Sequence, residues 1–388
     1  MPRLTKKLLP PPEAAPDLLV IAGEHSGDAH AAEMVAAYRA ANPQATVCAI
    51  GGPALERAGA QLLFDLTLHS VVGLIEVLKN YDFFRKVMAA SVDWVVTHRP
   101  RAVCFVDYPG FNLRLARRLM RAKAATRAGG PTRLLYYISP QLWAWKGHRR
   151  FAMAKMLDSL AVIFPFEPAV YADTSLDVHY VGHPFVHPSH EPLVRYELGA
   201  PVLLLPGSRQ QAVARIFPRL VAAFLAARED HPSLSATVLY PDEALGDWLK
   251  DYLEAHDLER FISTRPTTDK DPHLACAALM SSGTMSLEVA LAGIPGAIVY
   301  LAHPLTYAIG RRLVKVPYLG IANLLLERPA WPEFIQDAAK GPALPERLLA
   351  CLDSSAPAQQ AAADAATLRQ SLSAKAEMTA AQWLGQWI

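Results

Sequence analysis

The sequence predicts an α/β protein made of two doubly wound, Rossmann-like domains that face a central cleft. With 388 residues, the chain is long for one ordinary domain and sufficient for two. Short apolar runs alternate with helical stretches, which indicates parallel sheets covered by helices on both faces. This alternation begins near residue 18 and begins again near residue 202, so we expect two such sheets.

The first series of elements begins with the apolar strand 18–22, the small polar loop 23–28 and a helix over 29–41. Further strands are predicted at 46–50, 102–106 and 134–138. Because ligands of doubly wound folds bind beyond the carboxyl ends of the strands, the loops that follow these strands are the candidate binding loops.

The second series begins with a strand at 202–205, the loop 206–209 and a helix to about residue 228. Strands at 236–240 and 296–301 follow, with a helix over 284–292 between them. We expect a flexible extension over 1–16, a first domain over 17–190 and a second domain over 191–360, followed by a helical tail over 361–388. The hinge between the two domains is expected near 185–198. The tail either packs back on the first domain or is exchanged between subunits.

Composition excludes several classes of protein. The chain is 52% hydrophobic and 19% charged, which is typical of a globular protein, and its net charge of +2 argues against a nucleic-acid binder. The four cysteines form no CxxC pair, which argues against zinc and disulfides and favours a reducing cytosol. No apolar region follows the basic N-terminal residues, and no run reaches about 18 uncharged apolar residues. We therefore expect no signal peptide and only peripheral membrane contact.

The loop over residues 23–28 lacks the GxGxxG spacing of a nicotinamide-binding fold. Glu24 and Ser26 are suited to hydrogen-bond sugar hydroxyls, and Gly27 allows a ligand close to the backbone. The alternative is a tight turn in which Ser26 or Asp28 caps the next helix.

Asp107 follows directly on the apolar run 103–106, so its carboxylate is expected at a binding edge. It is our candidate for the general base that takes the proton from an acceptor hydroxyl during transfer with inversion. The alternative is an aspartate that forms a local turn into Pro109.

The loop over residues 206–209 offers backbone N–H groups from Gly207, the hydroxyl of Ser208 and the cation of Arg209 to an anion such as a diphosphate. A purely structural turn is the alternative.

A second anion site is predicted where residues 281–288 begin a helix. Gly283 and Thr284 at the helix start can hold a diphosphate, and Glu288, one turn further along, can bind ribose hydroxyls. The alternative is a simple helix cap followed by an exposed glutamate.

Tryptophans and cations are combined over residues 139–150, which favours an anionic, amphipathic acceptor or a lipid headgroup. The candidate residues are Trp143, Lys146, Arg149 and Arg150. A packed aromatic corner with solvated basic residues is the alternative.

An apolar stretch over residues 71–84 is either part of the core or a lip that receives acyl chains. The candidate acyl contacts are Val72, Leu74, Ile75, Leu78, Phe83 and Phe84. His183, His187 and His190 lie on a loop at no ligand spacing, so we predict no metal site.

Taken together, these motifs resemble the lipid-A-disaccharide synthase family over about residues 18–337. The landmarks that carry the resemblance follow in order: Gly23–Asp28 as GE-x-SGD, Gly51-Gly52-Pro53, Asp107–Asn112, Ser139–Trp145 as SP-x-x-WAW, Pro165-Phe166-Glu167, Val181–Pro184, Leu205–Arg209, Ser282-Gly283-Thr284 with Leu287-Glu288, Val316-Pro317-Tyr318, and Asn323-Leu324-Leu325.

The resemblance implies a GT-B glycosyltransferase that transfers 2,3-diacylglucosamine from UDP to 2,3-diacylglucosamine 1-phosphate. The products would be UDP and a β-1,6-linked disaccharide 1-phosphate, a precursor of lipid A. The UDP-sugar is a substrate, and no cofactor is expected. It also implies peripheral association with the cytoplasmic face of the inner membrane, and it is compatible with a homodimer.

The resemblance assigns the essential aspartate to Asp107, the essential arginine to Arg209, and a nucleotide-side role to Glu288 and Asn323. This chain departs from the family's DAPDFN pattern, because Gly110 stands where a second aspartate is usual and Tyr108 where alanine is usual. That departure favours Asp107 as the sole base. It also motivates the rival hypothesis of an inactive UDP-sugar-binding protein at a membrane; another GT-B enzyme, such as a UDP-sugar epimerase, is the second alternative.

Overall fold

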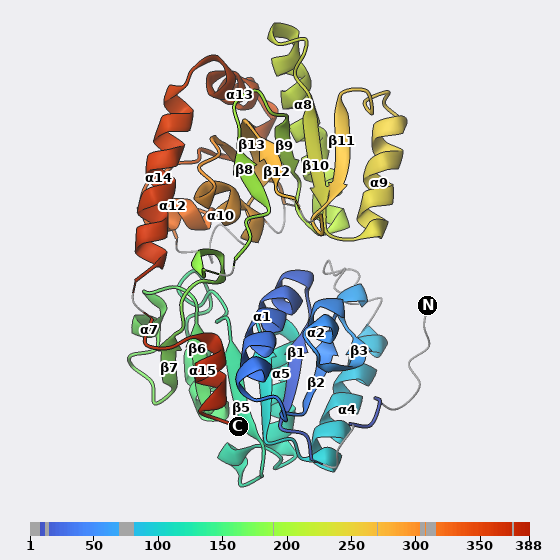
Figure 1. Cartoon of the computed structure of the whole chain (residues 1–388), viewed down its shortest axis with the longest axis vertical. Helices are drawn as coiled ribbons and strands as arrows, with labels where there is room; N and C mark the ends of the chain where they lie inside the picture. Colours follow the sequence, from blue (N-terminus) through green and yellow to red (C-terminus); the bar gives the residue numbers. More distant parts are fainter. Residues whose placement is uncertain are drawn as a thin grey trace. The chain divides into compact units, whose positions relative to one another are not determined.

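The structure is a computed structural model that describes residues 8–11, 15–69, 81–188, 190–269, 271–302, 307, 316–374 and 376–388. The chain forms two compact units. Unit 1 comprises Met1–Pro184 and Ser373–Ile388, and unit 2 comprises Phe185–Leu372. In each unit a parallel sheet is flanked by helices (Figure 1), which confirms the predicted class of two doubly wound α/β domains.

The described residues of unit 1 form a seven-stranded parallel sheet with the order β3-β2-β1-β4-β5-β6-β7. Its strands are β1 (Leu18–Ala22), β2 (Val47–Gly51), β3 (Gln61–Asp65), β4 (Ala102–Val106), β5 (Arg133–Tyr137), β6 (Ser159–Val162) and β7 (Asp177–Tyr180). The chain runs outward from β1 to β3 and then returns to pair β4 with β1, so the strand order reverses between these two strands. Such a switch point is where doubly wound sheets bind ligands.

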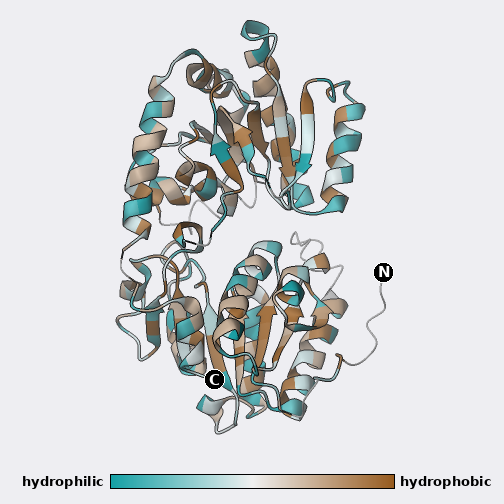
Figure 2. Cartoon of the chain, viewed as in Figure 1, coloured by the Kyte–Doolittle hydropathy of each residue, from teal (hydrophilic) through white to brown (hydrophobic). Residues whose placement is uncertain are grey.

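Helices cover the sheet of unit 1. They are α1 (His25–Ala41), α2 (Pro53–Arg57), α4 (Tyr81–His98), α5 (Pro109–Arg121), α6 (Arg149–Met156), α7 (Glu167–Val170) and α15 (Ala380–Gly385), with short 3₁₀ turns at Thr67–His69, Thr126–Ala128 and Pro184–Val186. All residues of β1 and β4 are buried, which explains why these strands are apolar throughout rather than alternating. Figure 2 shows these hydrophobic strands at the centre of the unit.

Unit 2 contains a six-stranded parallel sheet with the order β11-β10-β9-β13-β14-β15, and a separate pair, β12-β8. Its strands are β8 (Val194–Tyr196), β9 (Val202–Leu205), β10 (Ala236–Tyr240), β11 (Ile262–Pro266), β12 (His273–Ala275), β13 (Ala277–Ser281), β14 (Gly296–Tyr300) and β15 (Glu333–Ile335). Its helices are α8 (Gln210–Asp230), α9 (Glu243–Glu254), α10 (Thr284–Leu291), α12 (Ile321–Leu326), α13 (Ala343–Asp353) and α14 (Ala356–Leu372), with a 3₁₀ turn at Gln336–Lys340. The strand order reverses between β9 and β13, which is the switch point of this unit.

Both ends of the chain pack on unit 1, and for the C-terminal end this is one of the two alternatives expected from the sequence. Within the N-terminal extension, Leu8 is buried in the core of unit 1, and the carbonyl of Leu9 accepts a hydrogen bond from Trp94 Nε1 at 2.9 Å. The expected tail helix is two helices, of which α14 belongs to unit 2 and α15 to unit 1. The chain therefore passes between the units twice, after residue 184 and after residue 372.

The C-terminal segment is held on unit 1 by a buried tryptophan. Trp383 on α15 is fully buried, and its Nε1 donates a hydrogen bond to Ser159 Oγ on β6 at 2.9 Å. Arg133 at the start of β5 donates to the carbonyl of Trp387 at 2.8 Å. The last residues of the chain thus complete the packing of a unit whose first strand begins at residue 18.

We predict that Trp383→Ala lowers the free energy of unfolding of unit 1 by about 3–5 kcal/mol, the usual cost of removing a fully buried tryptophan. Urea unfolding followed by circular dichroism measures this. Gln386→Ala, a change at an exposed position of the same segment, is the matched control and is expected to have little effect. Equal unfolding midpoints for the two variants would contradict the packing described here.

Candidate functional site

Asp107 lies at the switch point of unit 1, directly after β4, in a backbone conformation that is costly for a residue with a side chain. Asp107 and Tyr108 have φ of 43° and 47°, and left-handed residues of this kind cost about 1–3 kcal/mol each. The Asp107 carbonyl accepts hydrogen bonds from Tyr136 Oη at 2.6 Å and Asn112 Nδ2 at 2.8 Å, and its N–H donates to the Tyr137 carbonyl at 3.0 Å. These three bonds fix the backbone from which the candidate base projects.

A hollow of about 180 Å³ opens beside Asp107. Its lining includes Trp145, Lys146 and Arg149, so the structure brings the candidate base together with two of the predicted cations. Lys146 Nζ lies 4.0 Å from the centre of the Trp145 ring, and Trp145 is 42% exposed. Burial and the neighbouring charge of Arg149 lower the pKa of Lys146.

Two of the four candidate acceptor residues in the segment 139–150 do not line this hollow. Arg150 donates two hydrogen bonds to the carboxylate of Asp173, from Nε at 2.7 Å and from Nη2 at 2.5 Å, and a third to the Gly147 carbonyl. Trp143 packs edge-on against Phe166 with ring centres 5.5 Å apart. Trp143 therefore fits the packed aromatic corner that was the alternative for this segment, whereas Arg150 is salt-bridged rather than solvated as that alternative expected.

The loop after β1 lies next to the Asp107 loop, because Ala22 and Val106 are paired at the ends of β1 and β4. A Cβ atom on Gly23 would meet the Tyr108 ring at 2.1 Å, so this glycine is required for the close approach of the two loops. Glu24 occupies the N-cap position of α1, and Ser26 and Gly27 lie in the first turn. The structure thus brings Glu24, Ser26 and Gly27 to the same edge as Asp107.

Asp28 has a different role from the cap of α1 that was the alternative for this loop. It is buried and accepts hydrogen bonds from the N–H groups of Gly52 at 2.8 Å, Ala54 at 2.9 Å and Leu55 at 3.3 Å. It therefore caps α2, which follows β2, and ties two adjacent loops of the edge together.

Glu167 is a buried carboxyl that sequence reasoning did not select, although it belongs to the landmark 165–167. It is 1% exposed, and its Oε2 accepts from the N–H groups of Phe164 at 3.0 Å and Ile163 at 3.2 Å. Burial raises the pKa of Glu167 to about 8; the two backbone hydrogen bonds oppose this shift and the negative charge of Asp107 adds to it. Besides Asp107, the carboxyl edge of the unit 1 sheet therefore contains Glu167, a carboxyl group that holds its proton near neutral pH.

The predicted donor residues gather at the switch point of unit 2. Leu205 and Met280 are paired at the ends of β9 and β13, so the loops 206–209 and 281–284 are neighbours. Gly207 has φ of 108°, and a Cβ atom there would lie 3.1 Å from Ser281 Oγ. Ser208 and Arg209 are exposed before α8, and Gly283 and Thr284 are exposed at the start of α10. Five of the six candidate donor residues, including Glu288 on α10, therefore belong to these two loops and the helix that follows.

Glu288 is buried, which excludes the alternative of an exposed glutamate after a helix cap. Its Oε1 accepts from the Leu193 N–H at 2.7 Å and lies 3.4 Å from His190 Nε2. Its Oε2 is buried with no hydrogen-bond partner among the described residues. This link between α10 and the segment before β8 was not predicted from the sequence.

Asn323 is fully buried and forms hydrogen bonds within unit 2. Nδ2 donates to the Trp331 carbonyl at 2.7 Å and to Glu333 Oε1 at 2.9 Å, and Oδ1 accepts from the Trp331 N–H at 2.9 Å. Glu333 also accepts from the N–H groups of Leu319 and Gly320. Asn323 thus holds the turn between α12 and β15, and both of its amide hydrogens are used there.

The predicted apolar lip is only partly within the described residues. Val72, Leu74, Ile75 and Leu78 lie outside them. Phe83 and Phe84 are half-buried on α4 and pack against the core of unit 1, with Phe83 6.0 Å from Phe64, ring centre to ring centre. These two side chains fit the core alternative. No described helix is long and apolar enough to cross a bilayer.

The three histidines are placed separately. His183 is buried against Phe164 at 5.2 Å, His187 is exposed, and His190 lies beside Glu288. Within the described part of the chain, no group of three or more histidine, cysteine, aspartate or glutamate side chains could hold a metal ion.

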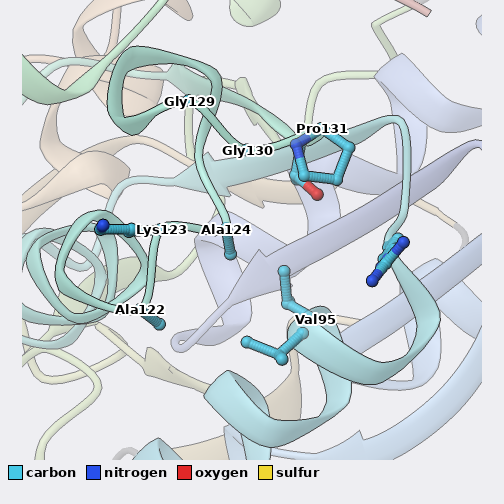
Figure 3. A pocket seen from close by; sticks show the side chains of 10 residues that line it. Val95, Ala122, Lys123, Ala124, Gly129, Gly130 and Pro131 are labelled. Atoms are coloured by element: carbon cyan, nitrogen blue, oxygen red, sulfur yellow. The ribbon is translucent and has the colours of Figure 1, made fainter.

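A larger hollow, of about 520 Å³, lies at the opposite edge of the unit 1 sheet (Figure 3). Its lining comes from the end of α4, the turn after α5 and the loop before β5, including Val95, Lys123 and Gly130. It contains none of the predicted site residues, and it lies at the amino ends of the strands. Of these two hollows, the smaller one is therefore the one that contains predicted site residues, namely Asp107, Lys146 and Arg149.

Comparison with solved structures defines the class of the protein. The putative UDP-N-acetylglucosamine 2-epimerase from Listeria monocytogenes matches with a TM-score of 0.58 at 12% identity, covering 90% of this chain and 91% of that one. The glycotransferase of kitacinnamycin matches with a TM-score of 0.55 at 12% identity, covering 96% and 98%. The fold is therefore GT-B, the fold shared by these glycosyltransferases and epimerases.

Sequence comparison identifies the family. The lipid-A-disaccharide synthetase model matches residues 18–386. The lipid-A-disaccharide synthase of Geobacter metallireducens is 34% identical over 367 residues, 92% of each chain. Lipid-A-disaccharide synthase 1 of Legionella pneumophila is 37% identical over 329 residues, 82% of this chain and 83% of that one. The chain belongs to the lipid-A-disaccharide synthetase family of glycosyltransferases.

We predict that Glu167→Gln reduces the pH dependence of stability. An unfolded glutamate titrates near 4.5 and folded Glu167 near 8, so the wild-type protein loses stability as the pH rises through this window, when the buried group must ionise. The glutamine variant cannot ionise. Its melting temperature should therefore fall less between pH 5 and pH 8.5, by about 2–4 °C for each kcal/mol of penalty avoided.

Differential scanning fluorimetry across this pH range measures the effect. Glu56→Gln, at an exposed position on α2, is the control and should keep the wild-type pH profile. Parallel profiles for Glu167→Gln and the wild type would show that Glu167 does not titrate in this window.

Proposed function

We propose that this chain joins two acylated sugars. It transfers 2,3-diacylglucosamine from UDP-2,3-diacylglucosamine to the 6-hydroxyl of 2,3-diacylglucosamine 1-phosphate, with inversion, and forms the β-1,6-linked disaccharide 1-phosphate and UDP in lipid A synthesis. The observation that carries the proposal is the family match over residues 18–386, which spans both units and both switch points. The UDP-sugar is a substrate, and the mechanism proposed here requires no cofactor.

In this mechanism, unit 1 holds the acceptor. The carboxylate of Asp107 accepts the proton of the 6-hydroxyl while the hydroxyl oxygen bonds to the anomeric carbon of the donor sugar. The bond from that carbon to the UDP oxygen breaks on the opposite face, and UDP leaves with the electron pair. The fixed backbone of Asp107 supports this role, because a general base must be held within hydrogen-bond reach of the proton it takes.

Unit 2 holds the donor. Ser208, Arg209 and the start of α10 at Gly283 and Thr284 bind the diphosphate, and the Arg209 cation stabilises the charge that develops on the leaving group. Glu288 binds the ribose hydroxyls, which its unpartnered Oε2 supports. For Asn323 we propose an indirect role, because its amide is already used to hold the turn near these loops.

The acceptor and donor both carry acyl chains, so we propose that the enzyme works at the cytoplasmic face of the inner membrane as a peripheral protein. Trp145 and Phe151, 42% and 45% exposed on and beside the segment that lines the Asp107 hollow, support an interfacial contact there. A homodimer remains a prediction from the resemblance.

The direct test is a mass-spectrometric turnover assay with both substrates in mixed micelles, without added divalent metal. We expect disaccharide 1-phosphate and UDP in equal amounts. UDP binding without any disaccharide, across several acyl-chain lengths, would contradict the proposed reaction and favour a sugar-nucleotide-binding protein without transferase activity.

We predict that Asp107→Asn and Arg209→Ala each lower kcat/KM by about 100-fold or more, since one positioned base or one charged stabiliser contributes on that order. Asp93→Asn on α4 and Arg215→Ala on α8 make the same changes at exposed positions and should leave turnover unchanged. Near-normal turnover in either test variant would remove that residue from the mechanism.

A further inference from the structure

The hollow beside Asp107 has more positive than negative charge. Its lining contains one carboxylate, Asp107, and two cations, Lys146 and Arg149. Neither Lys146 nor Arg149 takes part in any ion pair found among the described residues. Two adjacent cations that lack a carboxylate partner favour an anionic ligand, and the repulsion between them supports this, since it contributes to the lowered pKa of Lys146.

Not every cation of the segment 139–150 lacks an ion pair, as Arg150 shows. It follows Arg149 directly, yet its guanidinium is committed to the Asp173 carboxylate by two hydrogen bonds and to the Gly147 carbonyl by a third. Lys146 instead has a left-handed backbone, with φ of 53°, and stands over the exposed Trp145 ring at the rim of the hollow. The fold therefore separates one structural cation from two that remain available to a ligand.

The chemistry of a pyranose 1-phosphate matches this arrangement. The anomeric carbon and C5, which carries the hydroxymethyl group, both flank the ring oxygen, so the phosphate and the 6-hydroxyl extend from the same edge of the sugar ring. A compact hollow can therefore hold the phosphate on two cations and present the 6-hydroxyl to a carboxylate. The exposed tryptophan provides an apolar surface where a sugar ring or the start of an acyl chain can pack.

We propose that Lys146 and Arg149 bind the anomeric phosphate of the acceptor and thereby make the enzyme select a sugar 1-phosphate over the unphosphorylated sugar. The proposal rests on the proposed function, because it takes the hollow beside Asp107 as the acceptor site. The same two cations would also suit the phosphate of a phospholipid headgroup, so the experiment must distinguish the two sources.

The experiment compares two acceptors, 2,3-diacylglucosamine 1-phosphate and 2,3-diacylglucosamine, in mixed micelles with the full-length enzyme. The variants are Lys146→Gln, Arg149→Gln and the double variant; Lys155→Gln, at an exposed position on α6, is the matched control. For the double variant we expect kcat/KM to fall about 10- to 100-fold with the phosphorylated acceptor, since a hydrogen bond to a charged group contributes about that factor. We expect the loss mainly in the acceptor KM, with the donor KM and the rate on the unphosphorylated acceptor little changed.

An equal loss on both acceptors would overturn the proposal, because the cations would then not recognise the phosphate. An unchanged preference with reduced retention on phosphatidylglycerol vesicles would also overturn it and assign the cations to the membrane. If the wild-type enzyme forms no disaccharide with either acceptor, the proposed function itself fails, which is a separate result.

A second measurement avoids the variants altogether. Glucosamine 1-phosphate should inhibit the wild-type enzyme competitively with the acceptor, whereas glucosamine at the same concentration should not. Equal inhibition by the two soluble sugars would contradict recognition of the phosphate.

Discussion

The three hydrogen bonds on the Asp107 backbone are the constraint on which the candidate site depends. A left-handed aspartate followed by a left-handed tyrosine is unfavourable in isolation, so it persists only because Tyr136, Asn112 and the neighbouring strand hold it there. Tyr136 is itself buried, and burial raises its pKa well above the ordinary value, so its hydroxyl keeps its proton and donates at neutral pH. The packing of the unit 1 core offsets the conformational free energy of the strained turn. The Asp107 carboxylate is therefore held at the edge of the sheet.

In unit 2, as in unit 1, buried hydrogen bonds hold the loops that follow the strands, although the residues differ. In each unit, the strand order reverses beside the first strand of the sheet, and the two loops at that point carry the residues with chemistry. Polar side chains then tie neighbouring loops together, as Asp28 does for α1 and α2, and as Glu288 does for α10 and the segment before β8. Buried carboxylates thus help to hold the loops at both edges, in addition to apolar packing.

The strands β1, β2, β4, β5, β9, β10 and β14 were predicted from the sequence, because strands buried on both faces are apolar throughout and are followed by small polar loops. The strands β3, β6, β7, β8, β11, β12, β13 and β15 were not predicted, and neither were the long-range polar partners. Arg149 and Arg150 look equivalent in the sequence, yet only the position of Asp173 decides that Arg150 is structural. The burial of Glu167 and the coupling of Glu288 to His190 depend likewise on residues that meet only in the folded chain.

The two passages of the chain between the units make unit 2 an insertion within unit 1. This has a consequence for synthesis on the ribosome. Strand β6 of unit 1 is translated before unit 2, but Trp383, which packs against β6, is translated after unit 2. At about 5–20 residues per second, roughly 10–40 s separate the synthesis of residue 184 from that of Trp383. Unit 2 can complete its folding in that interval, while unit 1 waits for α15.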